Sequence, residues 1–359
     1  MSCYNPLKGF IVGIKDNGKK DIKIRSYETD HVELLRNGQY IDRPSKDVLI
    51  LGKPFYEFDT IPCGRCIGCR LQRAKSWADR AVLELPYHES NLFITLTYDD
   101  DHLPLSETVD ENGEPLMVST LVKEDLQLFW KRLRKYLYDE KKRSNPKITW
   151  SDAPKIRYLA CGEYGSDKNT HRPHYHAIVF GLELPDLKFY TKNQTGDYLY
   201  TSDILNSIWK QGYCIVGEAT HESIGYVARY VTKKKYGQDA EFYKRLNIIP
   251  EFLTMSRKPG IGREYYEEHK KDLFEKTRYF FPTRDGSGSA APSRYFNDLF
   301  ERDFDTESVL LRKNNLKAMY DNIIKSEMSK TDKNFLDYMA TKDYTKNDQI
   351  LALKRNVNL

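Results

Sequence analysis

The chain has 359 residues, of which 40% are hydrophobic and 13% aromatic, so it can bury a core in one large or two modest domains. No segment approaches the roughly 18 apolar residues of a membrane span, and the first residues lack the basic and then apolar layout of a secretory signal. These features argue against a membrane protein, and a net charge of +5 is too small to indicate a polyanionic partner by itself.

Hydrophobic patterning along the first half of the chain predicts short strands and then a strand between two helices. Weak alternation predicts strands at 10–14 and 47–51. Apolar residues recur at helical spacing in 71–85 and 122–138, which predicts two helices. The β-branched and aromatic run at 91–98 predicts a strand between them.

The second half of the chain begins with two strand-like runs, at 156–164 and 174–180. A polar loop separates them, which is typical of an antiparallel hairpin. A helix at 202–210, a strand at 213–218 and a helix at 222–234 are expected next. This order predicts an α+β fold, in which a central antiparallel sheet is flanked by helices. We expect a cysteine-rich N-terminal segment before this core and a helical C-terminal appendage after it.

Three cysteines in a C-x2-C-x2-C cluster precede the first predicted helix. Disulfides are not expected in a reducing compartment, and this spacing indicates a metal. A closed tetrahedral zinc site needs a fourth donor, for which Cys3 is the first candidate and His88 the alternative. Free thiols or an iron–sulfur cluster are the other interpretations. The predicted structural zinc ligands are Cys3, Cys63, Cys66 and Cys69.

The sharpest local pattern is the H-x-H pair of His174 and His176 in the strand predicted at 174–180. Alternate residues of a strand point to the same face, so both imidazoles can share one metal ion. On the preceding strand, Glu163 can complete a set of two histidines and one carboxylate that leaves positions open for phosphate and water. The alternative is that these histidines serve structure only.

Tyr226 and Tyr230 lie four residues apart in the helix predicted at 222–234. Their phenols therefore share one helix face, with Cβ atoms about 5–6 Å apart. A phenol can act as a covalent nucleophile when a metal polarises its target. In a chain with 26 tyrosines, packing is the alternative explanation. The neighbouring cations that suit this helix for phosphate are Arg229, Lys233 and Lys234.

Four stretches occur in an order that resembles one family of enzymes. They are CGRCIGCRLQRAKSWADR from Cys63, FITLTYDD from Phe93, GEYG from Gly162 with RPHYHAIVFG from Arg172, and YVARYVTKK from Tyr226. The chain resembles the rolling-circle replication initiators of the HUH endonuclease superfamily. Within that superfamily it is most similar to the replication proteins of microviruses, in particular the gokushovirus branch of single-stranded DNA phages.

This resemblance implies a metal-dependent single-strand endonuclease and ligase of the two-tyrosine type. Glu163, His174 and His176 would bind Mg²⁺ or Mn²⁺, and Tyr226 and Tyr230 would be the nucleophiles. One tyrosine would nick the origin strand and form a 5′-phosphotyrosyl intermediate, and the strand would be rejoined after rolling-circle synthesis. The enzyme would act in the cytoplasm of the host bacterium.

One position departs from the family pattern, which often has a lysine just before the second tyrosine. This chain has Arg229 there, so Lys233 or Lys234 could take the remaining role. The sequence has no G-x-x-x-x-G-K pattern, so a host helicase would unwind the DNA and a host polymerase would copy it. Single-stranded DNA would be held by aromatic stacking and by cations. The candidates are Trp77, Arg80, Lys131, Arg132, Arg134 and Arg229.

We expect four regions along the chain: an N-terminal segment with possible zinc ligands at 1–75, an HUH core at 76–236, a basic and aromatic extension at 237–300 and a helical appendage at 301–359. The alternatives in function are another HUH enzyme (a plasmid initiator, relaxase or transposase) or a non-catalytic protein that binds single-stranded DNA. The stretch SRKPGIGR at 256–263 has glycines and arginines that suit phosphate, but a tight turn explains it equally well.

Overall fold

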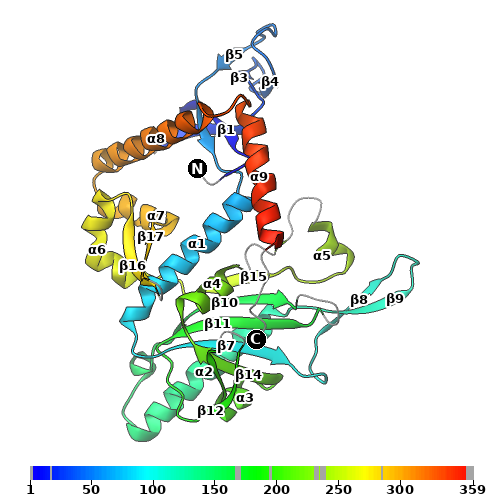
Figure 1. The fold of residues 1–359 in the computed structure, drawn as a ribbon, viewed down its shortest axis with the longest axis vertical. Helices are drawn as coiled ribbons and strands as arrows, with labels where there is room; N and C mark the ends of the chain where they lie inside the picture. Colours follow the sequence, from blue (N-terminus) through cyan, green and yellow to red (C-terminus); the bar gives the residue numbers. More distant parts are fainter. Residues whose placement is uncertain are drawn as a thin grey trace. The chain divides into compact units, whose positions relative to one another are not determined.

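The structure, a computed structural model, describes residues 3–16, 18–165, 171–193, 196–229, 234, 240–283 and 286–352 (Figure 1). The chain divides into two compact units. We call residues 73–316 the core unit, and residues 1–72 with 317–354 the terminal unit. The divisions fall inside helix α1 (Ile67–Glu84) and helix α8 (Thr306–Met328).

The terminal unit contains two small antiparallel sheets and the last helix. In chain order its elements are β1 (Leu7–Ile14), β2 (Lys20–Ser26), β3 (His31–Leu34), β4 (Tyr40–Arg43), β5 (Lys53–Phe55), β6 (Phe58–Ile61) and α9 (Phe335–Ala352). One sheet has the order β2-β1-β6 and the other the order β4-β3-β5. Strand β1 confirms the strand predicted at 10–14, and helices α8 and α9 confirm the helical C-terminal appendage.

The strand predicted at 47–51 is wrong, because this segment forms a loop with exposed apolar side chains. The buried carboxylate of Glu33 accepts hydrogen bonds from the backbone amides of Leu51 and Gly52, at 2.8 and 3.0 Å. A side chain thus satisfies these amides in place of a neighbouring strand. Alternation of apolar residues cannot reveal a partner that lies so far away in the sequence.

The core unit is built on a seven-stranded antiparallel sheet with the order β12-β13-β14-β7-β11-β10-β15. Its strands are β7 (Asn91–Tyr98), β10 (Arg157–Tyr164), β11 (Pro173–Phe180), β12 (Lys188–Lys192), β13 (Tyr198–Thr201), β14 (Gly212–Glu218) and β15 (Phe252–Met255). The predicted hairpin is the pair β10 and β11, and β11 lies between β10 and β7. This sheet confirms the predicted α+β fold.

Helices cover both faces of this sheet (Figure 1). Helices α2 (Lys123–Ser144) and α3 (Asp203–Trp209) pack on one face, against residues that include Leu96, Tyr175 and Val179. Helices α1 and α4 (His221–Arg229) pack on the other, against Phe93 and Ile178. Because side chains alternate along each strand, every second residue of β7, β10 and β11 belongs to the face under α1 and α4.

The remaining helices and hairpins of the core unit lie around this sheet. They are α5 (Glu241–Arg245), α6 (Arg263–Glu275), α7 (Arg294–Asp303), β8 (Leu105–Val109) with β9 (Pro115–Ser119), and β16 (Tyr279–Thr283) with β17 (Gly286–Ala290). Aromatic residues of α6 and α7 join the apolar cluster under α1. Among the described residues, no helix has both the length and the apolar character needed to cross a bilayer.

The helix predicted at 222–234 is α4 as far as Arg229. Two predicted site residues, Tyr230 and Lys233, lie outside the described residues. Lys234 is described and half-buried, but it belongs to no helix or strand.

Candidate metal centre and tyrosine helix

The candidate metal ligands come from the central hairpin of the core unit. In the antiparallel register of β10 and β11, Glu163 is directly opposite His174, and Cys161 is opposite His176. Residues two apart on a strand share a face, so all of these side chains lie under α1 and α4. Pro173 begins β11, a position where the missing amide proton of proline is tolerated.

Both imidazoles point at the same carboxylate oxygen. Nε2 of His174 is 2.7 Å from Oε1 of Glu163, and Nε2 of His176 is 2.9 Å from that same atom. The three potential ligand atoms lie within 4.8 Å of one another. The His176 side chain is 2% exposed and that of His174 19% exposed, so the cluster is closed on one side and reaches solvent on the other.

Hydrogen bonds behind the histidines fix their orientation. Nδ1 of His174 donates to the carbonyl oxygen of Arg172 at 3.0 Å, because a carbonyl can only accept. Nδ1 of His176 is 2.9 Å from the hydroxyl of Thr95, a buried residue of β7 that the sequence analysis did not identify. Such partners of the second ring nitrogen are typical of metal-binding histidines and leave Nε2 as the ligand atom.

The carboxylate of Glu163 is held in its ionised form. Burial raises the pKa of this side chain, but the hydrogen bonds and charges of His174 and His176 lower it further, so that the net pKa is well below the ordinary value. Two imidazoles and one ionised carboxylate, with a solvent-facing side, form a donor set that fits a divalent cation with open coordination positions.

Tyr226 packs directly on this cluster. Its ring centroid is 5.1 Å from that of His176 in an edge-on arrangement, and 6.2 Å from that of Phe93. Phe93 in turn stacks on His176, with centroids 5.6 Å apart. The structure therefore brings the half-buried phenol of Tyr226 next to the candidate ligands, while Arg229 lies exposed at the end of α4.

The four predicted zinc ligands come together in the terminal unit. The sulfur atoms of Cys3, Cys63, Cys66 and Cys69 lie within 4.8 Å of one another. Backbone amides point at these sulfurs, as from Cys63 to Cys3 and from Tyr4 to Cys66, each at 3.3 Å. The Cys3 thiol and amides that include Tyr4 lower the pKa of Cys66 to about 4. A thiolate among four convergent sulfurs fits a tetrahedral zinc ion. The alternative ligand His88 instead bonds Glu84.

Comparison with known proteins places the chain in a family. Residues 91–235 match the family of the replication-associated protein ORF2. The chain is 35% identical over 263 residues to replication-associated protein ORF2 of Spiroplasma virus 4, a match that covers 72% of this chain and 73% of the relative. The chain belongs to the replication-associated proteins of microviruses.

Two further microvirus replication-associated proteins support this membership. VP4 of Bdellovibrio phage phiMH2K is 32% identical over 243 residues, which is 67% of both chains. ORF4 of Chlamydia phage 1 is 33% identical over 265 residues, which is 69% of this chain and 56% of the relative. No solved structure matches. The segment that matches the replication-associated family runs from β7 to beyond α4 and so contains Glu163, His174, His176 and Tyr226.

The DNA-binding residues predicted for this microvirus replication protein fall on both faces of its central sheet. Trp77 and Arg80 belong to α1, on the face of the metal candidates, and line a pocket there. Lys131, Arg132 and Arg134 belong to α2, which covers the opposite face. Lys131 is exposed, whereas the other two α2 cations are half-buried.

Proposed function

We propose that this microvirus replication protein is a replication initiator that nicks single-stranded DNA and rejoins it through Tyr226. The observation that supports this proposal best is the meeting of Tyr226 with three convergent metal-ligand side chains on one face of the sheet. A phenol packed on a candidate metal ligand is placed to attack a phosphate held at that ligand. A purely structural tyrosine would not require two histidines to share one carboxylate.

Glu163, His174 and His176 would hold Mg²⁺ or Mn²⁺. A bound divalent ion would polarise the scissile phosphate and stabilise the negative charge that develops on its oxygens. Thr95 and the Arg172 carbonyl keep both Nε2 atoms aimed at the site. The protein thus contributes orientation before substrate arrives, which lowers the entropic cost of reaching the reactive geometry.

The nicking step transfers one phosphoryl group between two oxygens. The phenolic oxygen of Tyr226 forms a bond to phosphorus while the bond from phosphorus to the 3′-oxygen breaks. The phenolic proton is lost and the departing 3′-oxygen gains one, so the products are a 5′-phosphotyrosyl protein and a free 3′-hydroxyl. Because one phosphodiester replaces another, the bond energy is retained, and attack by a 3′-hydroxyl on the phosphotyrosine can reseal the strand.

Tyr230, which lies outside the described residues, is the proposed second nucleophile, with Lys233 or Lys234 as the accompanying cation. Two tyrosines would allow one to hold the 5′ end while the other attacks the regenerated junction. A host polymerase would extend the free 3′-hydroxyl and a host helicase would open the duplex. The four cysteines of the terminal unit would hold a structural zinc ion, since their sulfurs already converge.

The test is a covalent-adduct assay on circular single-stranded DNA that carries a randomised segment. Purified protein is incubated with Mn²⁺, and DNA that stays bound to protein under denaturing conditions is sequenced to locate the nick. We expect an adduct on the 5′ side of the nick, abolished by His176→Ala and by Glu163→Gln. Tyr226→Phe should lower it strongly, and the double change with Tyr230→Phe should abolish it.

Tyr213→Phe is the matched control, because Tyr213 is 64% exposed on β14 and lies outside the proposed site. This variant should form the adduct at the parent level. If DNA is bound but no adduct forms on any sequence with Mn²⁺ or Mg²⁺, the proposal fails, and a non-catalytic DNA-binding role takes its place.

A further inference from the structure

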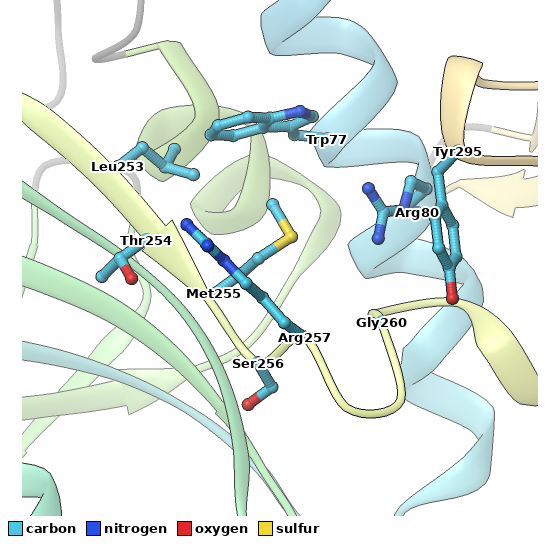
Figure 2. A pocket seen from close by; sticks show the side chains of 9 residues that line it. All are labelled: Trp77, Arg80, Leu253, Thr254, Met255, Ser256, Arg257, Gly260 and Tyr295. Atoms are coloured by element: carbon cyan, nitrogen blue, oxygen red, sulfur yellow. The ribbon is translucent and has the colours of Figure 1, made fainter. Parts of the chain in front are cut away.

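A pocket of about 260 Å³ opens on the core unit beside the proposed catalytic site. Its wall is built from three separate parts of the chain, namely α1, the segment from β15 to Gly260, and the start of α7. Figure 2 shows the indole of Trp77 and the guanidinium of Arg257 directed into it, with Met255 between them. Arg80 and Tyr295 close another side.

The pocket lies on the same face of the sheet as the candidate metal ligands. In the register of β10 with β15, Leu253 is opposite Cys161, which is itself opposite His176 on β11. Residues directly opposite in an antiparallel pair share a face. Adjacent strands are about 4.8 Å apart, so the Leu253 wall lies roughly 10 Å from His176 along this row. That span corresponds to one or two nucleotides of an extended strand.

The turn that carries Arg257 is fixed by hydrogen bonds from buried arginines. Arg157 donates to the carbonyl oxygen of Pro259 at 2.9 Å, and Arg80 donates to the carbonyl oxygen of Ile261 at 2.9 Å. At Gly260 a Cβ atom would lie 2.7 Å from the ring of Tyr295, so only glycine allows this approach. The turn is therefore held rigidly at the pocket mouth, which a mere surface connection does not require.

The polar groups that face the pocket are mainly donors. Arg257 is exposed, and within the described part of the chain no carboxylate pairs with it. Arg80 is 7% exposed, and its guanidinium lies 4.1 Å from the ring centroid of Tyr295. Ser256 accepts a backbone amide of Tyr158 through its hydroxyl oxygen, which leaves the hydroxyl proton to donate. A flat indole beside such donors suits a planar ligand that carries acceptors.

We propose that this pocket binds one base of the single-stranded DNA substrate, one or two nucleotides from the scissile phosphate, and that it prefers guanine. The base would stack on Trp77, and Arg257 would donate to the adjacent acceptors O6 and N7, which only guanine presents as a pair. Pockets for drug-sized ligands occupy about 300–1,000 Å³, so this smaller space suits a single base. The inference rests on the proposed function, since it takes single-stranded DNA as the ligand.

The test measures binding without catalysis. The full chain carrying Tyr226→Phe is titrated, without added divalent metal, against fluorescent dT oligonucleotides that have a single central dG, dA, dC or dT. We expect the dG oligonucleotide to bind at least about fivefold more tightly than the others, the low end of a bidentate arginine contact. Adding Arg257→Gln should abolish this preference. Trp77→Leu should weaken binding of every oligonucleotide by about fivefold or more, and Trp77→Phe by less.

Arg143→Gln is the matched control, because Arg143 is exposed on α2 and α2 covers the opposite face of the sheet. It removes the same charge and should keep the dG preference. Equal affinity for all four oligonucleotides, or a dG preference that survives Arg257→Gln in a variant with an unchanged thermal midpoint, would overturn the pocket proposal. Nicking is scored separately, so an adduct without base preference refutes only the pocket, and a base preference without adduct refutes only the chemistry.

Discussion

Replacing Thr95 with valine should weaken metal binding at the site of Glu163, His174 and His176. The hydroxyl of Thr95 lies 2.9 Å from Nδ1 of His176, and the two residues are 7% and 2% exposed. Water has little access to replace the lost hydrogen bond, and valine keeps the shape of threonine. Loss of such a supporting bond costs about 10- to 100-fold in metal affinity, or about 1.4–2.7 kcal/mol.

Isothermal titration with Mn²⁺ measures this affinity directly, and the covalent-adduct assay gives a second readout. Adduct formation by Thr95→Val should recover at saturating Mn²⁺, because Tyr226 and all three ligands are still present. Thr97→Val is the matched control: Thr97 lies on the same strand and face, opposite His174. Equal Mn²⁺ affinity in the Thr95 variant and the parent, or equal weakening by the Thr97 variant, would refute the supporting role of this hydroxyl.

The remaining predictions concern stability. Tyr175→Phe leaves the backbone amide and carbonyl of Val122 without the phenol that bonds both, so urea unfolding should show a loss of about 1–3 kcal/mol. Bonds from Arg43 and other donors hold the pKa of Glu33 at about 2, so its ionised form stabilises the fold above about pH 4.5, and this contribution disappears as pH falls toward 2. The difference in thermal midpoint between parent and Glu33→Gln should therefore shrink over that range, whereas a constant difference would contradict it. Cys66→Ser should abolish stoichiometric zinc measured by mass spectrometry and lower the thermal midpoint as a chelator does to the parent; an unchanged zinc content would exclude the four-cysteine site.

The sequence was most informative where strands are buried on at least one face. The runs that form β7, β10 and β11 have the β-branched and aromatic character of buried strands, and their two-residue period predicts that His174 and His176 share a face. The pairing with Glu163 could be predicted because a hairpin makes it local. By contrast, every side chain of β12 is exposed, so no apolar alternation marked that strand.

The pocket and the supporting hydrogen bonds could not be predicted, because they depend on residues far apart in the chain. Trp77, Met255 and Tyr295 meet only after β15 has joined the edge of the sheet next to β10. The SRKPGIGR stretch correctly suggested a turn with arginines available to a ligand, but the sequence contains no sign that Trp77 faces it. In the same way, the position of Thr95 beside His176 follows from the register of β7 with β11.

The sheet also separates two sets of cations that the sequence could not distinguish. Lys131, Arg132 and Arg134 are on α2, so the sheet lies between them and the candidate metal ligands. Arg80 and Arg257 share the face of those ligands and border a pocket about two strand spacings away. A strand short enough to be held only around the scissile phosphate can therefore contact Arg257 but not α2. If α2 binds DNA, it must bind a more distant part of the molecule, such as the duplex that flanks the nicked strand.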